Sequence, residues 1–172
     1  MNKQFKNGNG YLVIALIMMA ILFYSSSQTY EQQTTVPFLE KMLKNEPFKN
    51  SLSNVSFTYA GSPVSIETSG YFKFVEFFIR KLAHFGTYFI LGGSLFLGIN
   101  PRMQHLGISF GVAWLSATGY AALDEFHQMM TGGRSPLFED VILDSSGAIL
   151  ACTILVIYYL LAHRKKGAKK RS

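Results

Sequence analysis

The apolar residues of this chain gather in four stretches that are separated by polar segments. They cover residues 11–24, 82–99, 106–123 and 141–162. A helix needs roughly 17 to 25 mostly apolar residues to cross a bilayer, and the last three stretches have that length. Polar residues at 25–27 extend the shorter first stretch at its end. The pattern therefore predicts one all-α membrane domain, residues 1–172, built as a bundle of about four transmembrane helices.

The first stretch has a second interpretation. Lys3 and Lys6 precede it and three serines follow it, an arrangement that is also typical of a secretory signal peptide. No clean cleavage site follows the run, and a retained helix gives an even number of spans. We therefore interpret residues 11–24 as a transmembrane helix.

Basic residues near the ends of the stretches predict the orientation. They are Lys3 and Lys6 before the first stretch, Arg102 before the third, and six lysines and arginines within residues 163–172. Because Lys and Arg are enriched at cytoplasmic ends of spans, both termini are expected in the cytoplasm. Residues 25–81 then form a long extracytoplasmic loop, and residues 124–140 form a polar turn on the same side. Arg80 and Lys81 oppose this rule locally.

The long loop has local patterns of its own. Residues 38–43 carry apolar side chains at helical spacing after Pro37, which favours the first turn of a helix. Residues 55–66 are rich in β-forming residues around a Gly-Ser-Pro turn and predict a small hairpin. Thr68 or Ser69 is expected to cap an interfacial helix that leads into the second span.

Composition supports the membrane assignment. The chain is 49% hydrophobic and 15% charged, whereas a soluble domain carries about 25% charged residues. The net charge of +6 comes from the basic tail. Such a tail after an apolar stretch is typical of a cytoplasmic anchor, so we expect the lipid bilayer as a partner and no nucleic acid. The single cysteine, Cys152, forms no disulfide framework or zinc cluster and is interpreted as a packing residue.

Ionisable residues gather on one predicted side of the membrane, at the ends of the second, third and fourth spans. An ionisable side chain inside a span costs at least about 2.5 to 3.5 kcal/mol and needs a partner or water. Helical spacing places these residues in polar stripes that converge if the spans pack closely through their small residues. The stripes are Lys81, His84 and Tyr88; Asp124, His127 and Gln128; and Asp140 and Asp144.

The same residues carry a resemblance to a known family. "RKLAHFGTYFILGG" followed by "ALDEFHQMMTGGRSPLFEDVILDSSGAIL" is similar to VanZ-like proteins, small bacterial integral membrane proteins named for low-level resistance to the glycopeptide teicoplanin. The family's pattern falls on Lys81, His84, Phe85, Tyr88, Asp124, Glu125, Gln128, Gly133, Arg134, Asp140, Asp144 and Gly147. The resemblance covers residues 76–161. It implies a multi-pass protein of the bacterial cytoplasmic membrane and no established reaction.

The favoured hypothesis is a binding protein. It binds or shields an amphiphile at the outer leaflet, either a lipoglycopeptide such as teicoplanin or an anionic lipid or cell-wall precursor headgroup. Arg134, Lys81 and His84 would hold the anionic group, because arginine suits the oxygens of phosphate and carboxylate. The expected ligand-binding residues are Lys81, His84, Tyr88, Glu125, Gln128, Arg134, Asp140 and Asp144.

A membrane enzyme that modifies a lipid or a lipid-linked precursor is the first alternative. His84 with Asp124 or Asp140 would be a base and its orienting acid, and Glu125 a proton donor. Nothing marks Ser135 or Ser145 as a nucleophile. The metal variant of this hypothesis takes oxygen ligands from Asp124, Glu125, Asp140 and Asp144. The spacing argues against zinc, and we expect no metal and no cofactor.

The second alternative is a structural salt-bridge cluster in a scaffold protein. In it Arg134 pairs with Asp140 or Glu125 and only holds the turn. Lys81 reaches either the lipid headgroups or a carboxylate of the cluster. His127 lies at the interface and is expected to be exposed.

Overall fold

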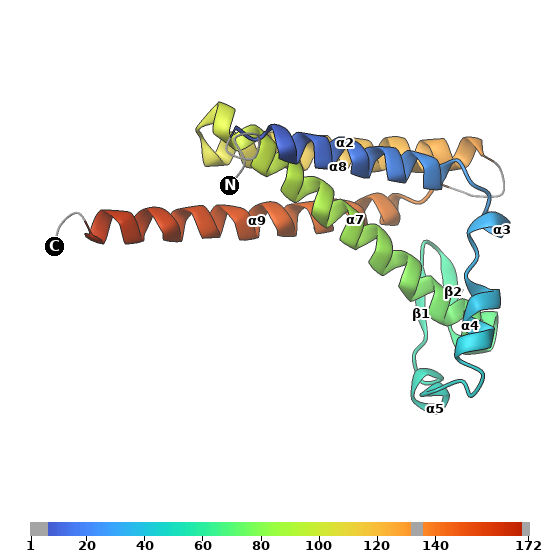
Figure 1. Ribbon diagram of the computed structural model, residues 1–172. Coiled ribbons are helices and arrows are strands. Elements are labelled where there is room, and N and C mark those ends of the chain that lie inside the picture. The colour runs from blue at the N-terminus through green and yellow to red at the C-terminus, as the bar shows by residue number, and fades with distance from the viewer. Residues whose placement is uncertain (1–6, 132–135, 170–172) are drawn as a thin grey trace.

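The computed structural model of the chain describes residues 7–131 and 136–169. Within these residues, four helices are long and apolar enough to cross a membrane. They are α2 (Asn9–Ser26), α7 (Tyr71–Met103), α8 (Leu106–Met130) and α9 (Phe138–Lys169). Helix α7 packs against each of the other three, and α2 and α8 lie side by side (Figure 1). The prediction of an all-α membrane protein with four spans is confirmed.

Helix α7 is longer than a membrane is thick. Its 33 residues extend about 50 Å at about 1.5 Å per residue, whereas the hydrocarbon core measures about 30 Å. Its N-terminal part therefore projects beyond the bundle, and residues 27–70, the loop segment, pack around it (Figure 1). The loop segment contains α3 (Tyr30–Gln33), α4 (Val36–Met42), α5 (Lys49–Leu52), β1 (Phe57–Tyr59), β2 (Ser62–Val64) and α6 (Ile66–Ser69).

Two predictions for the loop segment are confirmed and two details are wrong. The helix after Pro37 is α4, and the hairpin is the antiparallel pair β1–β2. Its turn lies at Ala60 and Gly61, not at Gly-Ser-Pro, and both residues have the positive φ that a type I′ hairpin turn requires. Ser65, rather than Thr68 or Ser69, caps a helix here, and that helix is the short α6.

The predicted links between the spans are shorter in the structure. Helix α8 continues to Met130 and α9 begins at Phe138, so half of the predicted turn at 124–140 is helical. Helix α7 likewise runs to Met103 and includes Pro101. Apolar stretches mark where a chain meets lipid, whereas backbone hydrogen bonds carry a helix on through polar residues. The sequence boundaries therefore fell inside the helices.

Small residues bring the helices together. Ala113, Ala117 and Ala121 form a buried stripe on α8 at a spacing of four residues. A Cβ atom at Gly92 would lie 2.7 Å from the Cα of Ala148, so α7 and α9 are in close contact there. Cys152 is buried beside them, and its thiol donates to the Gly92 carbonyl at 3.5 Å, which agrees with a packing role.

The outer surface of the bundle is apolar. Leucines on all four helices are more than half exposed, including Leu16, Leu82, Leu115 and Leu160. A soluble protein rarely exposes such a continuous apolar surface. The surface suits a bilayer, where lipid tails replace water as the solvent.

Candidate functional site

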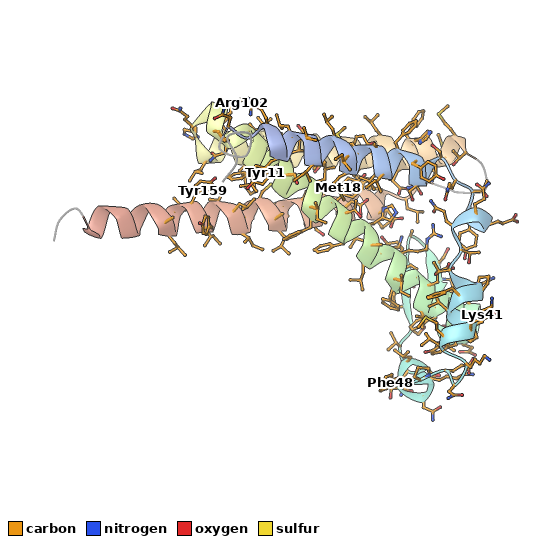
Figure 2. The ribbon with its side chains drawn as sticks, in the orientation of Figure 1. Tyr11, Met18, Lys41, Phe48, Arg102 and Tyr159 are labelled. Carbon is orange, nitrogen blue, oxygen red and sulfur yellow. The ribbon has the colours of Figure 1, made fainter. Side chains whose placement is uncertain are left out.

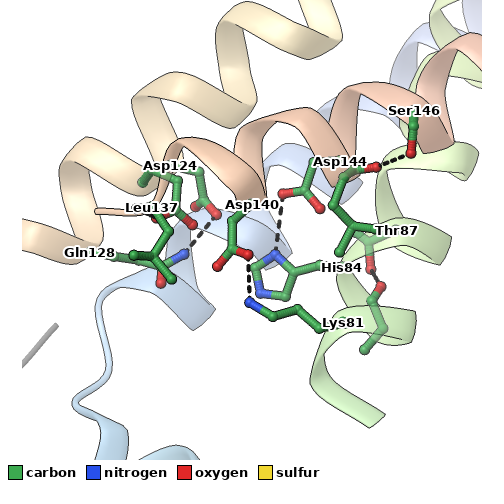
Figure 3. A network of polar contacts seen from close by, with 12 residues as sticks. Lys81, His84, Thr87, Asp124, Gln128, Leu137, Asp140, Asp144 and Ser146 are labelled. Carbon is green, nitrogen blue, oxygen red and sulfur yellow. Dashed lines mark hydrogen bonds and ion pairs between the residues drawn. The ribbon is translucent and has the colours of Figure 1, made fainter. Parts of the chain in front are cut away.

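A polar cavity of about 180 Å³, the polar pocket, lies where α8 ends and α9 begins, against the side of α7. Its walls are Tyr30, Arg80, Lys81, His84, Glu125, Gln128, Leu137, Asp140, Leu143 and Asp144. Figure 3 shows side chains of α7 pointing toward carboxylates of the other two helices. Six of the eight residues that the sequence suggested for ligand binding line this cavity. Tyr88 is not among the lining residues, and Arg134 lies outside the described residues.

Lys81 and Asp140 form an ion pair across the pocket. The Lys81 Nζ lies 2.5 Å from the Asp140 Oδ1, and both side chains are about one-fifth exposed. The hydroxyl of Tyr59, in the hairpin of the loop segment, donates to the same carboxylate oxygen at 2.5 Å. Burial, together with this hydrogen bond, raises the pKa of Tyr59. The loop segment, which lay outside the sequence resemblance, thus contributes directly to the site.

His84 pairs with Asp144, not with Asp124 or Asp140 as the enzyme hypothesis expected. Its Nδ1 lies 3.4 Å from the Asp144 Oδ2. The partner is set by helix packing. Gly147, one turn after Asp144, presses against the backbone of Phe85, and a side chain there would collide with it. This contact fixes α9 so that Asp144 faces His84.

Helix α8 supplies two more buried carboxylates. The amide of Gln128 donates to the Asp124 Oδ2 at 3.1 Å. The backbone N–H of Leu137 donates to the Glu125 Oε2 at 3.0 Å. Both carboxylate side chains are 5% exposed, so they are held away from water and from the acyl chains.

Arg80 is a pocket residue to which no role was assigned from the sequence pattern. Its Nη2 donates to the side chain of Gln33 at 3.2 Å, and its guanidinium lies 5.1 Å above the ring of Tyr30. Its Nη1 is buried and has no hydrogen-bond partner within the described residues. The local conflict with the positive-inside rule was the sequence signal that could have found it.

The VanZ/LLP1 protein-family model matches residues 11–161. The chain belongs to the VanZ/LLP1 family. No curated protein and no solved structure matches the chain. The family match is wider than the resemblance at residues 76–161, because it also includes α2 and the loop segment.

One other prediction for this VanZ/LLP1 chain is wrong, that for His127, and the remaining residues named from the sequence are Ser145, Ser135 and Gly133. His127 is not exposed: its ring stacks on Phe23 at 4.5 Å, and its Nδ1 lies 2.7 Å from the Ser26 hydroxyl. Ser145 accepts a hydrogen bond from Trp114 at 2.9 Å and does not line the pocket. Ser135 and Gly133 lie outside the described residues.

The carboxylates of the VanZ/LLP1 pocket do not form one coordination sphere. Within residues 7–131 and 136–169, no three His, Cys, Asp or Glu side chains are placed to hold a metal ion. The oxygen-ligand set expected by the metal hypothesis, Asp124, Glu125, Asp140 and Asp144, is therefore divided among separate partners. The chemistry available here is charge pairing, hydrogen bonding and proton exchange.

The polar pocket and Arg102, in the last turn of α7, lie at opposite ends of the bundle. Arg102 donates to the Gly98 carbonyl at 2.5 Å and to Asn9 at the start of α2. Figure 2 shows Arg102 beside that start. Helix α8 begins three positions after Met103 and reaches the pocket only in its last turns.

Proposed function

We propose that this VanZ/LLP1 chain binds the charged headgroup of a membrane amphiphile in the polar pocket. The observation that supports this function best is Arg80. Gln33 and Tyr30 fix its guanidinium, yet one buried N–H group has no acceptor among the described residues. A fixed guanidinium with a free donor suits an oxygen of phosphate or carboxylate. Lys81 supplies a further positive charge in the same wall, and His84 supplies an imidazole ring there.

The size of the cavity limits the ligand. Pockets for drug-sized molecules measure about 300 to 1,000 Å³, and the polar pocket has about 180 Å³. A phospholipid or precursor headgroup fits this space. A lipoglycopeptide such as teicoplanin can insert only one of its groups, so a lipid-type headgroup is the favoured ligand.

The side of the membrane that the pocket faces is inferred from the basic residues. Arg102 lies at the opposite end of the bundle from the pocket. Basic residues favour the cytoplasmic side, so the pocket faces the outside of the bacterial cytoplasmic membrane. The apolar helix faces beside it then contact acyl chains of the outer leaflet.

A pair of arginines tests this function. The full chain is purified in detergent and titrated with dihexanoyl phosphatidylglycerol, and binding is followed by calorimetry. Arg80→Gln should weaken binding at least tenfold, because a charge-assisted hydrogen bond contributes about 1.5 to 3 kcal/mol. Arg102→Gln, the matched control at the other end, should bind like the parent chain. Equal loss in both variants, or no binding by the parent, would contradict the proposal. Teicoplanin added as a competitor shows whether it enters the same pocket.

A membrane enzyme remains a second candidate because of one observation. His84 and Asp144 form the histidine–carboxylate pair that orients a general base, and Glu125 lies in the same pocket. Lipid extracts of cells with and without the protein, compared by mass spectrometry, test this candidate. A lipid species that depends on the protein and disappears with His84→Gln supports catalysis. Identical lipid profiles rule it out.

A further inference from the structure

We propose that the headgroup bound in the polar pocket carries a primary ammonium beyond its phosphate, and that Asp144, Asp124 and Tyr88 recognise its N–H groups. The ligand class is thus an amine-bearing phospholipid of the phosphoethanolamine type. This inference rests on the proposed binding function and specifies the chemical class of its ligand. The phosphate contacts Arg80 at one side of the pocket, and the amine reaches deeper between the helices.

Three acceptor atoms in this region have no partner within the described residues. They are the Oδ1 of Asp144, the Oδ1 of Asp124 and the hydroxyl oxygen of Tyr88. Asp144 is 1% exposed and lines the pocket, and Tyr88 is completely buried. The two carboxylates interact electrostatically with the Tyr88 hydroxyl, so the three groups belong to one neighbourhood. Buried polar atoms without partners are rare in folded proteins and call for an explanation.

A primary ammonium matches this set of atoms. It has three N–H donors and no acceptor. The three unpaired atoms belong to residues of α7, α8 and α9, the three helices that meet at the polar pocket. A phosphate would bring only acceptors to these carboxylates, and a hydroxyl brings one O–H donor where a primary ammonium brings three N–H donors.

The charged groups of the described residues also favour a cation in the deep part of the pocket. Lys81 pairs with Asp140, and His84 pairs with Asp144. Asp124 accepts from the amide of Gln128 and interacts with the side chain of Ser26, and Glu125 accepts from the backbone N–H of Leu137. His127, which faces Asp124 from its own helix, is engaged with Ser26. The deep part of the pocket therefore favours a cation, while Arg80 favours an anion.

A quaternary ammonium fits less well. Choline groups are usually bound by the faces of aromatic rings. Here the aromatic rings next to Lys81, those of Tyr59 and Phe77, already lie 4.5 and 5.3 Å from its Nζ. The unpaired groups are oxygen atoms, and these need N–H donors that choline lacks. The volume agrees with a small headgroup, since about 180 Å³ corresponds to about six waters at about 30 Å³ each.

Three short-chain lipids that differ in the headgroup test this inference. The full chain in detergent is titrated with the dihexanoyl forms of phosphatidylethanolamine, phosphatidylcholine and phosphatidylglycerol. The first two share a phosphate and a cationic nitrogen but differ in N–H donors. We expect phosphatidylethanolamine to bind at least tenfold more tightly than phosphatidylcholine. Asp144→Asn should remove this preference, and Tyr88→Phe should reduce it.

The controls separate the two proposals. Glu139→Gln changes an exposed carboxylate in the first turn of α9 and should leave the preference unchanged. Binding of phosphatidylglycerol by Asp144→Asn, at or above the parent's affinity, shows that this variant is folded. Equal binding of all three lipids by the parent overturns the amine inference and leaves the headgroup function standing. Preference that survives in Asp144→Asn also overturns it. No binding of any lipid overturns both.

Discussion

Two buried carboxylates beside α7 differ in how completely they are hydrogen-bonded. Glu76 and Asp144 are each 1% exposed. Glu76 accepts from the hydroxyls of Tyr30 and Thr34, both at 2.9 Å, and from the backbone N–H of Thr35 at 2.5 Å. Asp144 has one long contact, 3.4 Å from His84, and its other oxygen has no hydrogen-bond partner within the described residues.

The difference separates a structural carboxylate, Glu76, from Asp144, the carboxylate that we propose to contact the ligand. A buried charge stabilises a protein only when its hydrogen-bonding capacity is met. Glu76 meets this condition and fastens the loop segment to α7. Burial and the hydrogen bond to Glu76 raise the pKa of the Tyr30 hydroxyl. Asp144 does not meet this condition, which is expected of a group that a ligand completes.

The largest effect should come from Glu76→Ala. The substitution leaves the donors of Tyr30, Thr34 and Thr35 without their acceptor, so we expect the free energy of unfolding to fall by about 3 to 5 kcal/mol. Limited proteolysis should cut the loop segment much faster than in the parent chain. Glu67→Ala, an exposed glutamate of α6, is the matched control. A loop segment that stays protected in Glu76→Ala would show that the comparison is wrong.

The ion pair between Lys81 and Asp140 should have a smaller effect. Lys81→Met leaves a partly buried carboxylate with Tyr59 as its remaining partner, which should cost about 1 to 2 kcal/mol of unfolding free energy. The exchange Lys81→Asp with Asp140→Lys tests the purely structural hypothesis. Under that hypothesis stability and headgroup binding both return. We expect stability to return in part and binding to remain lost, as measured by denaturant unfolding and lipid titration.

Tyr59→Phe should have a still smaller effect. It removes one hydrogen bond to Asp140 while the ring keeps its place beside Lys81, so about 0.5 to 1.5 kcal/mol of stability is expected to be lost. Hydrogen exchange of the β1–β2 hairpin is the measurement. Exchange rates equal to those of the parent would mean that the hairpin is held by its aromatic contacts alone.

Asp144→Asn should change stability least. Its contact with His84 is long at 3.4 Å, and asparagine keeps an oxygen acceptor of the same size there, so we expect an unfolding free energy within about 1 kcal/mol of the parent. The same variant should lose the preference for phosphatidylethanolamine over phosphatidylcholine while it still binds phosphatidylglycerol. A destabilisation as large as that of Glu76→Ala would contradict the separation between the two carboxylates.

Much of the site could be predicted from the chain, but its partners could not. Spacing alone placed Lys81, His84, Asp140 and Asp144 at converging helix ends, because a regular helix fixes which residues share a face. The pairing of His84 with Asp144 could not be predicted in the same way. It depends on how far α9 is rotated and advanced along α7, and the contact of Gly147 with Phe85 sets both.

The amino-acid sequence is enough to establish four membrane spans and membership of the VanZ/LLP1 family. The spans can be predicted because about 20 consecutive apolar residues suffice to define one, whatever the rest of the chain does. The part of the loop segment in the pocket is visible only in the folded protein. Arg80 is oriented by Gln33, and Asp140 is reached by Tyr59 from 81 positions away. Such contacts depend on how segments distant in the sequence dock together, and no local pattern of residues records that geometry.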